Sequence, residues 1–268
     1  MLRRTSRQST SAAVVACLAL GLSGLAATAS AAPTVKVKAE AVPIPGFPHT
    51  GNIYGAGAAV KAEVAISGTE YGGFPPPLIH VNVFLPKFTE LHPAGFPTCA
   101  VSLLEPAGPG PTACPKGSRA GPTGHVLGEV AFGKEIVPEE ATIESFYKPG
   151  GGIEFFTAGH SPVSLEVLAK GQFVHLHGAG GFGPELETEV PLVETVPGAQ
   201  DASALKITLQ TGSAIHLHGK TLYYGTVPTR GHCPKGGFKG KAEFTFAGLG
   251  GLPQTTVPVP VRAPCPKR

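Results

Sequence analysis

The 268-residue sequence has no tryptophan, one methionine and a single aspartate, Asp201. An EF-hand loop and a catalytic aspartate pair both need several aspartates, so this scarcity argues against both kinds of site. Beyond residue 31 the chain also lacks the Gly-x-Ser-x-Gly turn of many hydrolases and the His-Glu-x-x-His motif of metalloproteases. The sequence therefore predicts no catalytic residue. Its 17 glutamates leave open a secreted hydrolase with an unrecognised site.

Long amphipathic patterns are missing as well. No segment keeps a 3.6-residue hydrophobic period, which argues against an α/β fold with crossover helices. The 37 glycines and 28 prolines indicate many turns, and between them apolar and polar residues alternate, as over 60–66. This pattern predicts an all-β fold. We expect an antiparallel β-sandwich, immunoglobulin-like or jelly-roll-like, with at most one short helix over 100–105. The expected strands cover 35–38, 60–66, 78–85, 125–132, 142–147, 153–157, 163–168, 173–177, 185–190, 205–210, 214–224, 238–246 and 255–261.

The N-terminus has the three parts of an export signal. Residues 1–11 carry Arg3, Arg4 and Arg7 without an acid, and a short apolar run follows over 12–26. Ala29-Ser30-Ala31 then supplies a small-x-small cleavage site. We expect a signal peptide over 1–31 that is cleaved near Ala31, and a secreted, extracellular mature protein.

Removal of this signal also removes the positive charge of the chain. The remaining 237 residues contain 18 Lys+Arg and 18 Asp+Glu, so the mature chain has no net charge. It has no basic face for nucleic acid and no further apolar stretch long enough to span a membrane. Its length suits one β-sandwich domain over 32–268, or two subdomains that meet near 133–141.

Four cysteines follow the signal and are expected to be oxidised outside the cell. Cys99 and Cys114 enclose a short stretch that is rich in proline and glycine. Cys233 and Cys265 flank the two strands expected over 238–246 and 255–261, and a hairpin would bring them together. Of three ways to pair four cysteines, we predict Cys99–Cys114 and Cys233–Cys265. These bonds are expected to staple the fold.

Three stretches of the chain resemble a known group of sequences. They are PAGFPTCAVSLLEPAGPGPTACPKGSRAG (93–121), TEVPLVETVPGAQDAS (188–203) and YYGTVPTRGHCPKGGFKGKAEFTF (223–246). Their FPTC…CPKGS, VPLV…VPGA and CPKGGF motifs are similar to those of an uncharacterised family of secreted actinobacterial proteins. The resemblance implies a β-rich extracytoplasmic protein and supports the disulfide pairing. It implies no activity, cofactor or substrate.

Two near-identical segments, FVHLHG and AIHLHG, carry paired histidines: His175 with His177, and His216 with His218. Residues i and i+2 of a strand point to one face, so each pair would share a face. If the two strands were neighbours, four imidazoles could hold Zn or Cu. The other interpretation is two solvated strand faces that bind nothing.

The expected function follows from these patterns. We expect a secreted, non-catalytic β-sandwich protein that needs no cofactor. It would bind an unknown extracellular ligand or envelope component, or have a structural role there. The alternatives are an extracellular Zn- or Cu-binding protein and a secreted hydrolase.

Overall fold

The computed structural model describes residues 32–44, 46–47, 57–132, 135–175, 181–195, 200–227 and 234–264. These ranges consist mainly of antiparallel strands, with one short helix, α1 (Val101–Leu104), and one 3₁₀ turn, η1 (Pro111–Ala113). Among the described residues, no helix has the length and apolar character needed to cross a membrane. The strands are β1 (Thr34–Val42), β2 (Ala59–Ser67), β3 (Leu78–Phe84), β4 (Glu90–Leu91), β5 (Gly124–Phe132), β6 (Glu135–Tyr147), β7 (Ile153–Gly159), β8 (Leu165–Val174), β9 (Glu185–Glu189), β10 (Ser203–Thr211), β11 (Ala214–Leu217), β12 (Lys220–Tyr223), β13 (Gly225–Thr226), β14 (Phe238–Phe246) and β15 (Thr255–Ala263).

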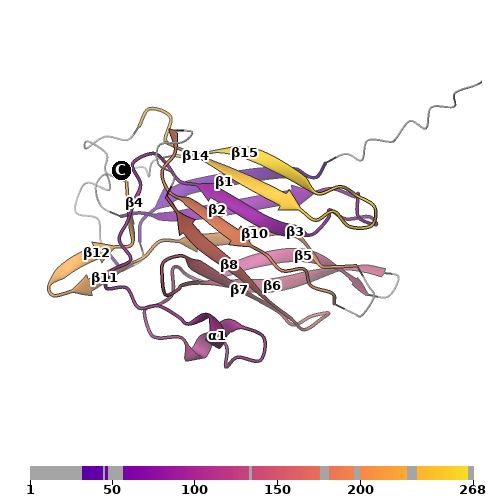
Figure 1. Ribbon diagram of the computed structural model, residues 1–268, viewed down its shortest axis with the longest axis horizontal. Helices are drawn as coiled ribbons and strands as arrows, with labels where there is room; N and C mark the ends of the chain where they lie inside the picture. The colour runs from indigo at the N-terminus through magenta and orange to yellow at the C-terminus, as the bar shows by residue number, and fades with distance from the viewer. Residues whose placement is uncertain are drawn as a thin grey trace, which may run out of the picture.

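Eleven of the described strands form one antiparallel sheet, in the order β1-β2-β10-β5-β6-β7-β8-β9-β3-β14-β15. The sheet curves until its two edge strands, β1 and β15, lie beside each other, so it is nearly closed (Figure 1). The predicted all-β antiparallel fold is confirmed, and so is the short helix within 100–105. The two layers expected of a sandwich are opposite halves of this one continuous sheet.

The gap between the edge strands has a cause in the sequence of β15. In its pairing with β14, Pro258 lies opposite Glu243 and Pro260 lies opposite Lys241. A proline has no N–H, so in a continuous antiparallel ladder its nitrogen points away from the partner strand. Both nitrogens therefore point to the side of β15 where β1 lies. This explains why no hydrogen-bonded pairing joins β1 to β15 in the described residues.

Alternation along the strands gives the sheet an apolar inner face and a polar outer face. In β2, Ala62 and Val64 face the interior, whereas Lys61 and Glu63 lie outside and form ion pairs with residues of neighbouring strands. Val64 packs in one buried cluster with Phe244 of β14. Burial of such side chains contributes about 1.5–3 kcal/mol each, which favours closure of the sheet.

The segment that carries α1 covers part of the outer face. Its Cys99 and Leu104 pack against Phe146 of β6, Phe156 of β7 and Leu168 of β8, and all five side chains are buried. Figure 1 shows α1 below these three strands. Both faces of the strands are therefore covered, which explains why apolar residues occur on both.

Two strand predictions need correction. The segment 214–224 is a hairpin of β11 and β12 rather than one strand, because His218 and Gly219 form its turn with φ of 49° and 74°. The strands expected over 163–168 and 173–177 belong to one continuous β8. Near 133–141, where we considered a boundary between subdomains, β6 begins at Glu135 and pairs with both β5 and β7 within the same sheet.

Candidate functional site

The curved sheet encloses a cavity of about 450 Å³. Its lining draws on residues from all eleven strands of that sheet. Because strand residues alternate between faces, the lining residues of a strand are mostly every second one, as with Leu165, Val167 and Ala169 of β8. The cavity is thus a direct consequence of the alternating pattern and of the closure of the sheet.

The lining is almost entirely aliphatic or aromatic. Small and β-branched side chains are frequent, and the ionisable groups among the described lining residues are Glu129, Glu139, Lys241 and two tyrosines, Tyr147 and Tyr224. A site of this size and character suits a small, largely apolar molecule, because most of the lining offers no hydrogen-bonding group.

Glu139 is the buried acid of this cavity. It lies on β6 in phase with Ala141 and Ile143, and only 3 % of its surface is exposed. The backbone N–H of Val163 donates a hydrogen bond to its Oε2 atom over 3.2 Å. Its Oε1 atom is buried and has no hydrogen-bond partner among the described residues. A carboxylate oxygen in that position retains its capacity to accept a hydrogen bond.

Aromatic side chains gather where β6 ends, at Tyr147. Its ring stacks on that of Tyr224, and Phe96 meets both rings edge-on. Burial raises the pKa of the Tyr147 phenol, and a hydrogen bond with Ser213 lowers it in part. Burial also raises the pKa of Tyr224. Both phenols therefore stay neutral at physiological pH.

Three acids with a raised pKa lie outside the cavity lining. Burial is the main cause at Glu154, Glu185 and Asp201, and a nearby acid adds to the rise at each of them. Glu154 is fully buried, and its Oε1 atom lies 3.5 Å from the Lys148 Nζ atom, which lowers its pKa in part. Glu154 belongs to the outer face of β7, so it does not act on a molecule in the cavity.

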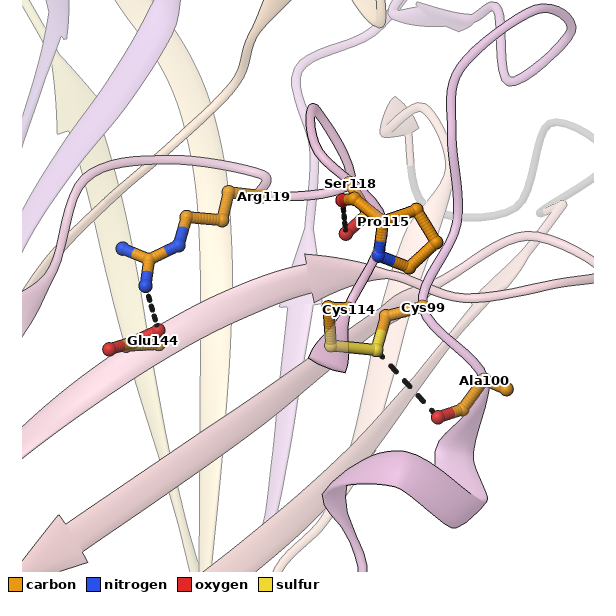
Figure 2. The surroundings of a disulfide bond; sticks show 7 residues. All are labelled: Cys99, Ala100, Cys114, Pro115, Ser118, Arg119 and Glu144. Atoms are coloured by element: carbon orange, nitrogen blue, oxygen red, sulfur yellow. Dashed lines mark hydrogen bonds and ion pairs between the residues drawn. A yellow bond between two sulfur atoms is a disulfide. The ribbon is translucent and has the colours of Figure 1, made fainter. Parts of the chain in front are cut away.

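The predicted disulfide between Cys99 and Cys114 is present, and the Cα atoms lie 5.0 Å apart. Figure 2 shows the bond together with contacts of the residues that follow Cys114. The Ser118 hydroxyl donates to the carbonyl of Pro115 over 2.7 Å, and Arg119 pairs with Glu144 of β6. The disulfide loop is therefore held to the outer face of the sheet. Cys233 and Cys265 lie outside the described residues.

The predicted histidine set is divided between two parts of the fold. His175 follows the last residue of β8, and His177 lies outside the described residues. His216 lies on β11, where its ring is 4.8 Å from that of Phe47 and its Nδ1 atom is 3.2 Å from the Thr221 hydroxyl. His218 is in the turn that follows, so it does not share a strand face with His216 as expected. The described residues contain no group of three or more potential metal ligands.

We did not predict the cavity from the sequence, although the alternation of apolar and polar residues indicates which side chains line it. Over 139–143, Glu139 is in phase with Ala141 and Ile143, while Glu140 and Thr142 alternate with them. Because Ala141 and Ile143 lie on the apolar inner face, the same phase places Glu139 on that face. Alternation alone does not show that the inner faces of strands far apart in the sequence enclose a cavity.

No family model, curated protein or solved structure matches this chain. The resemblance to secreted actinobacterial proteins therefore stays a prediction, and the function has to be inferred from the cavity itself.

Proposed function

We propose that this protein is an exported, non-catalytic binding protein that holds a small apolar molecule inside its sheet. The observation that supports this function is the cavity of about 450 Å³ with its apolar lining. Ligand sites of small molecules have volumes of about 300–1,000 Å³. Transfer of an apolar molecule from water into such a lining is favourable without any specific hydrogen bond.

The choice of side chains on the inner face supports the same conclusion. Ala62, Ala141, Ala169 and Ala242 all line the cavity, each on a different strand. Protein interiors are normally close-packed, with few voids larger than a water molecule. Larger apolar residues at these positions would fill the cavity, so the alanines leave space for a ligand.

Location outside the cell is part of the proposal and has its own support. Residues 1–31 have the pattern of a cleavable export signal. The Cys99–Cys114 disulfide is of a kind that persists in oxidising compartments. An apolar molecule has low solubility there, and enclosure in a protein would keep it in solution.

The described geometry favours binding over hydrolysis. The acids with a raised pKa, Glu154, Glu185 and Asp201, are not among the cavity-lining residues. The described residues likewise show no metal-ligand cluster that would favour the Zn or Cu alternative.

Two matched substitutions on β2 test the proposal. Ala62 lines the cavity, whereas Ala65, three residues later, is exposed on the outer face. We expect the wild type to bind the apolar fluorescent probe N-phenyl-1-naphthylamine. Ala62→Phe should weaken binding at least about tenfold because the ring occupies the cavity, and Ala65→Phe should bind as the wild type does. Ala62→Leu is the milder variant should the phenylalanine disturb folding, which circular dichroism would reveal.

Two results would contradict the proposal. One is absence of probe binding by the folded wild type. The other is equal affinity of the folded Ala62 and Ala65 variants, since the probe would then bind elsewhere. Extraction of the purified protein with organic solvent, followed by mass spectrometry, gives an independent search for a molecule carried from the producing cell.

A further inference from the structure

Glu139 is the one cavity-lining residue of the described structure with a buried side-chain oxygen that lacks a hydrogen-bond partner. Burial of a polar group without a partner costs free energy, so most buried oxygens in proteins are hydrogen-bonded. Replacement by an apolar residue would remove that cost. An acid at this position therefore calls for a hydrogen-bond donor that the described residues do not supply.

The position of the carboxylate depends on a glycine of the neighbouring strand. Ala141 of β6 pairs with Gly159 of β7, and a Cβ atom on Gly159 would lie 2.4 Å from the Glu139 Oε1 atom. Any side chain at residue 159 would thus displace the carboxylate. The absent side chain leaves room for the carboxylate on the inner face, where Glu139 is one of the residues that line the cavity.

The two oxygens of Glu139 have different surroundings. Oε2 accepts the Val163 N–H, which fixes the carboxylate to the segment between β7 and β8. Oε1 remains without a partner, and no ion pair of the described residues involves Glu139. Lys241, the cationic lining residue, pairs with Glu243 on the same strand. No cation among the described residues therefore satisfies Oε1.

We propose that Glu139 is a polar anchor, whose Oε1 atom accepts a hydrogen bond from a donor group on an otherwise apolar ligand. This inference rests on the proposed function and specifies its ligand class. The ligand has an apolar body and carries a hydroxyl or amine group. A ligand that ends in a carboxylate is disfavoured, because it offers no hydrogen-bond donor when ionised.

Displacement of N-phenyl-1-naphthylamine by three ligands of equal chain length tests this anchor: dodecanol, dodecylamine and dodecanoate. The variants are Glu139→Gln, whose amide oxygen can still accept the Val163 N–H, and Glu140→Gln, an adjacent control on the exposed face. In the wild type and in Glu140→Gln, we expect the alcohol or the amine to bind about tenfold or more tightly than dodecanoate. In Glu139→Gln this preference should fall by about tenfold or more.

The possible results separate the two proposals. If the folded wild type binds neither the probe nor any of the three ligands, the proposed function fails, and the anchor with it. If the ligands bind but Glu139→Gln has the same preference as the wild type, the anchor alone is wrong and the carboxylate only positions the Val163 segment. Tightest binding of dodecanoate by the wild type would also overturn the anchor. A preference for the amine over the alcohol would identify the donor as a cation, and the reverse would identify it as a hydroxyl.

Discussion

The rings of Tyr147 and Tyr224 are stacked, with their centroids 3.8 Å apart and their planes 11° from parallel. The two residues are far apart in the sequence: one ends β6 and the other follows β12. The Tyr147 hydroxyl also lies 3.0 Å from that of Ser213, just before β11. The stack therefore fastens the small β11–β12 hairpin to the large sheet, at a point where both rings line the cavity.

This contact predicts a graded loss of stability. Tyr224→Ala should lower the free energy of unfolding by about 3–5 kcal/mol, because it removes a buried ring and leaves a hole beside Phe96. Tyr147→Phe keeps the stack and loses only the hydrogen bond to Ser213, at about 1 kcal/mol. Urea unfolding followed by circular dichroism measures both. Equal effects of the two substitutions would show that stacking is not the main contribution.

The Cys99–Cys114 bond should stabilise the protein through its loop. The double variant Cys99→Ala/Cys114→Ala is expected to lose about 3 kcal/mol, since the bond closes a loop of 15 residues in the unfolded chain. Urea unfolding under non-reducing conditions measures this loss. With a reducing agent present in both samples, the difference between the wild type and the variant should become small, because reduction breaks the Cys99–Cys114 bond of the wild type and any Cys233–Cys265 bond in both. A wild type that is unaffected by reduction, although its thiols are then shown to be free, would contradict the prediction.

The mature protein should contain two disulfides and begin at Ala32. The β14–β15 hairpin supports the second bond, because its last pair, Phe238 with Ala263, brings together the strand ends that follow Cys233 and precede Cys265. Intact mass spectrometry of the exported protein should give the mass of residues 32–268 less four hydrogen atoms. Reduction should restore those hydrogens. If Cys233 and Cys265 react with an alkylating reagent before reduction, the second bond is absent.

Glu154 should make stability depend on pH. Burial raises its pKa above the ordinary value of 4.5, although Lys148 opposes the shift. The folded state then holds the proton more tightly than the unfolded state, so the contribution to stability is present below the unfolded pKa and is lost as pH rises through the folded pKa. Glu154→Gln does not titrate. Its stability relative to the wild type should therefore increase as pH rises from the ordinary value of 4.5 through the raised pKa of the folded state.

Thermal unfolding over this pH range measures the difference, with Glu140→Gln on the exposed face of the neighbouring β6 as the control. The control should differ little from the wild type at any pH. A Glu154→Gln variant that loses stability relative to the wild type as pH rises would show that the ion pair with Lys148 outweighs burial.

Much of the fold could be predicted because the relevant signals are local. Alternation over Val60–Val64 and the turn-forming glycines located most strands within a few residues. The short helix after Cys99 and the Cys99–Cys114 bond were equally accessible, since the helix and the loop closed by the bond each lie within one short segment. The paired histidines show the limit of this reasoning. His175 follows an extended strand, while His218 of the similar second segment lies in a turn.

The sequence by itself determined the all-β class, most strand positions and the first disulfide, because each depends on neighbouring residues or on composition. Only the tertiary structure decided that β10 lies between β2 and β5, and that β3 lies between β9 and β14. Strand pairing uses backbone groups that every strand possesses, so local patterns do not specify the partner. The cavity and the free oxygen of Glu139 exist only because those distant strands meet around an inner face of small side chains.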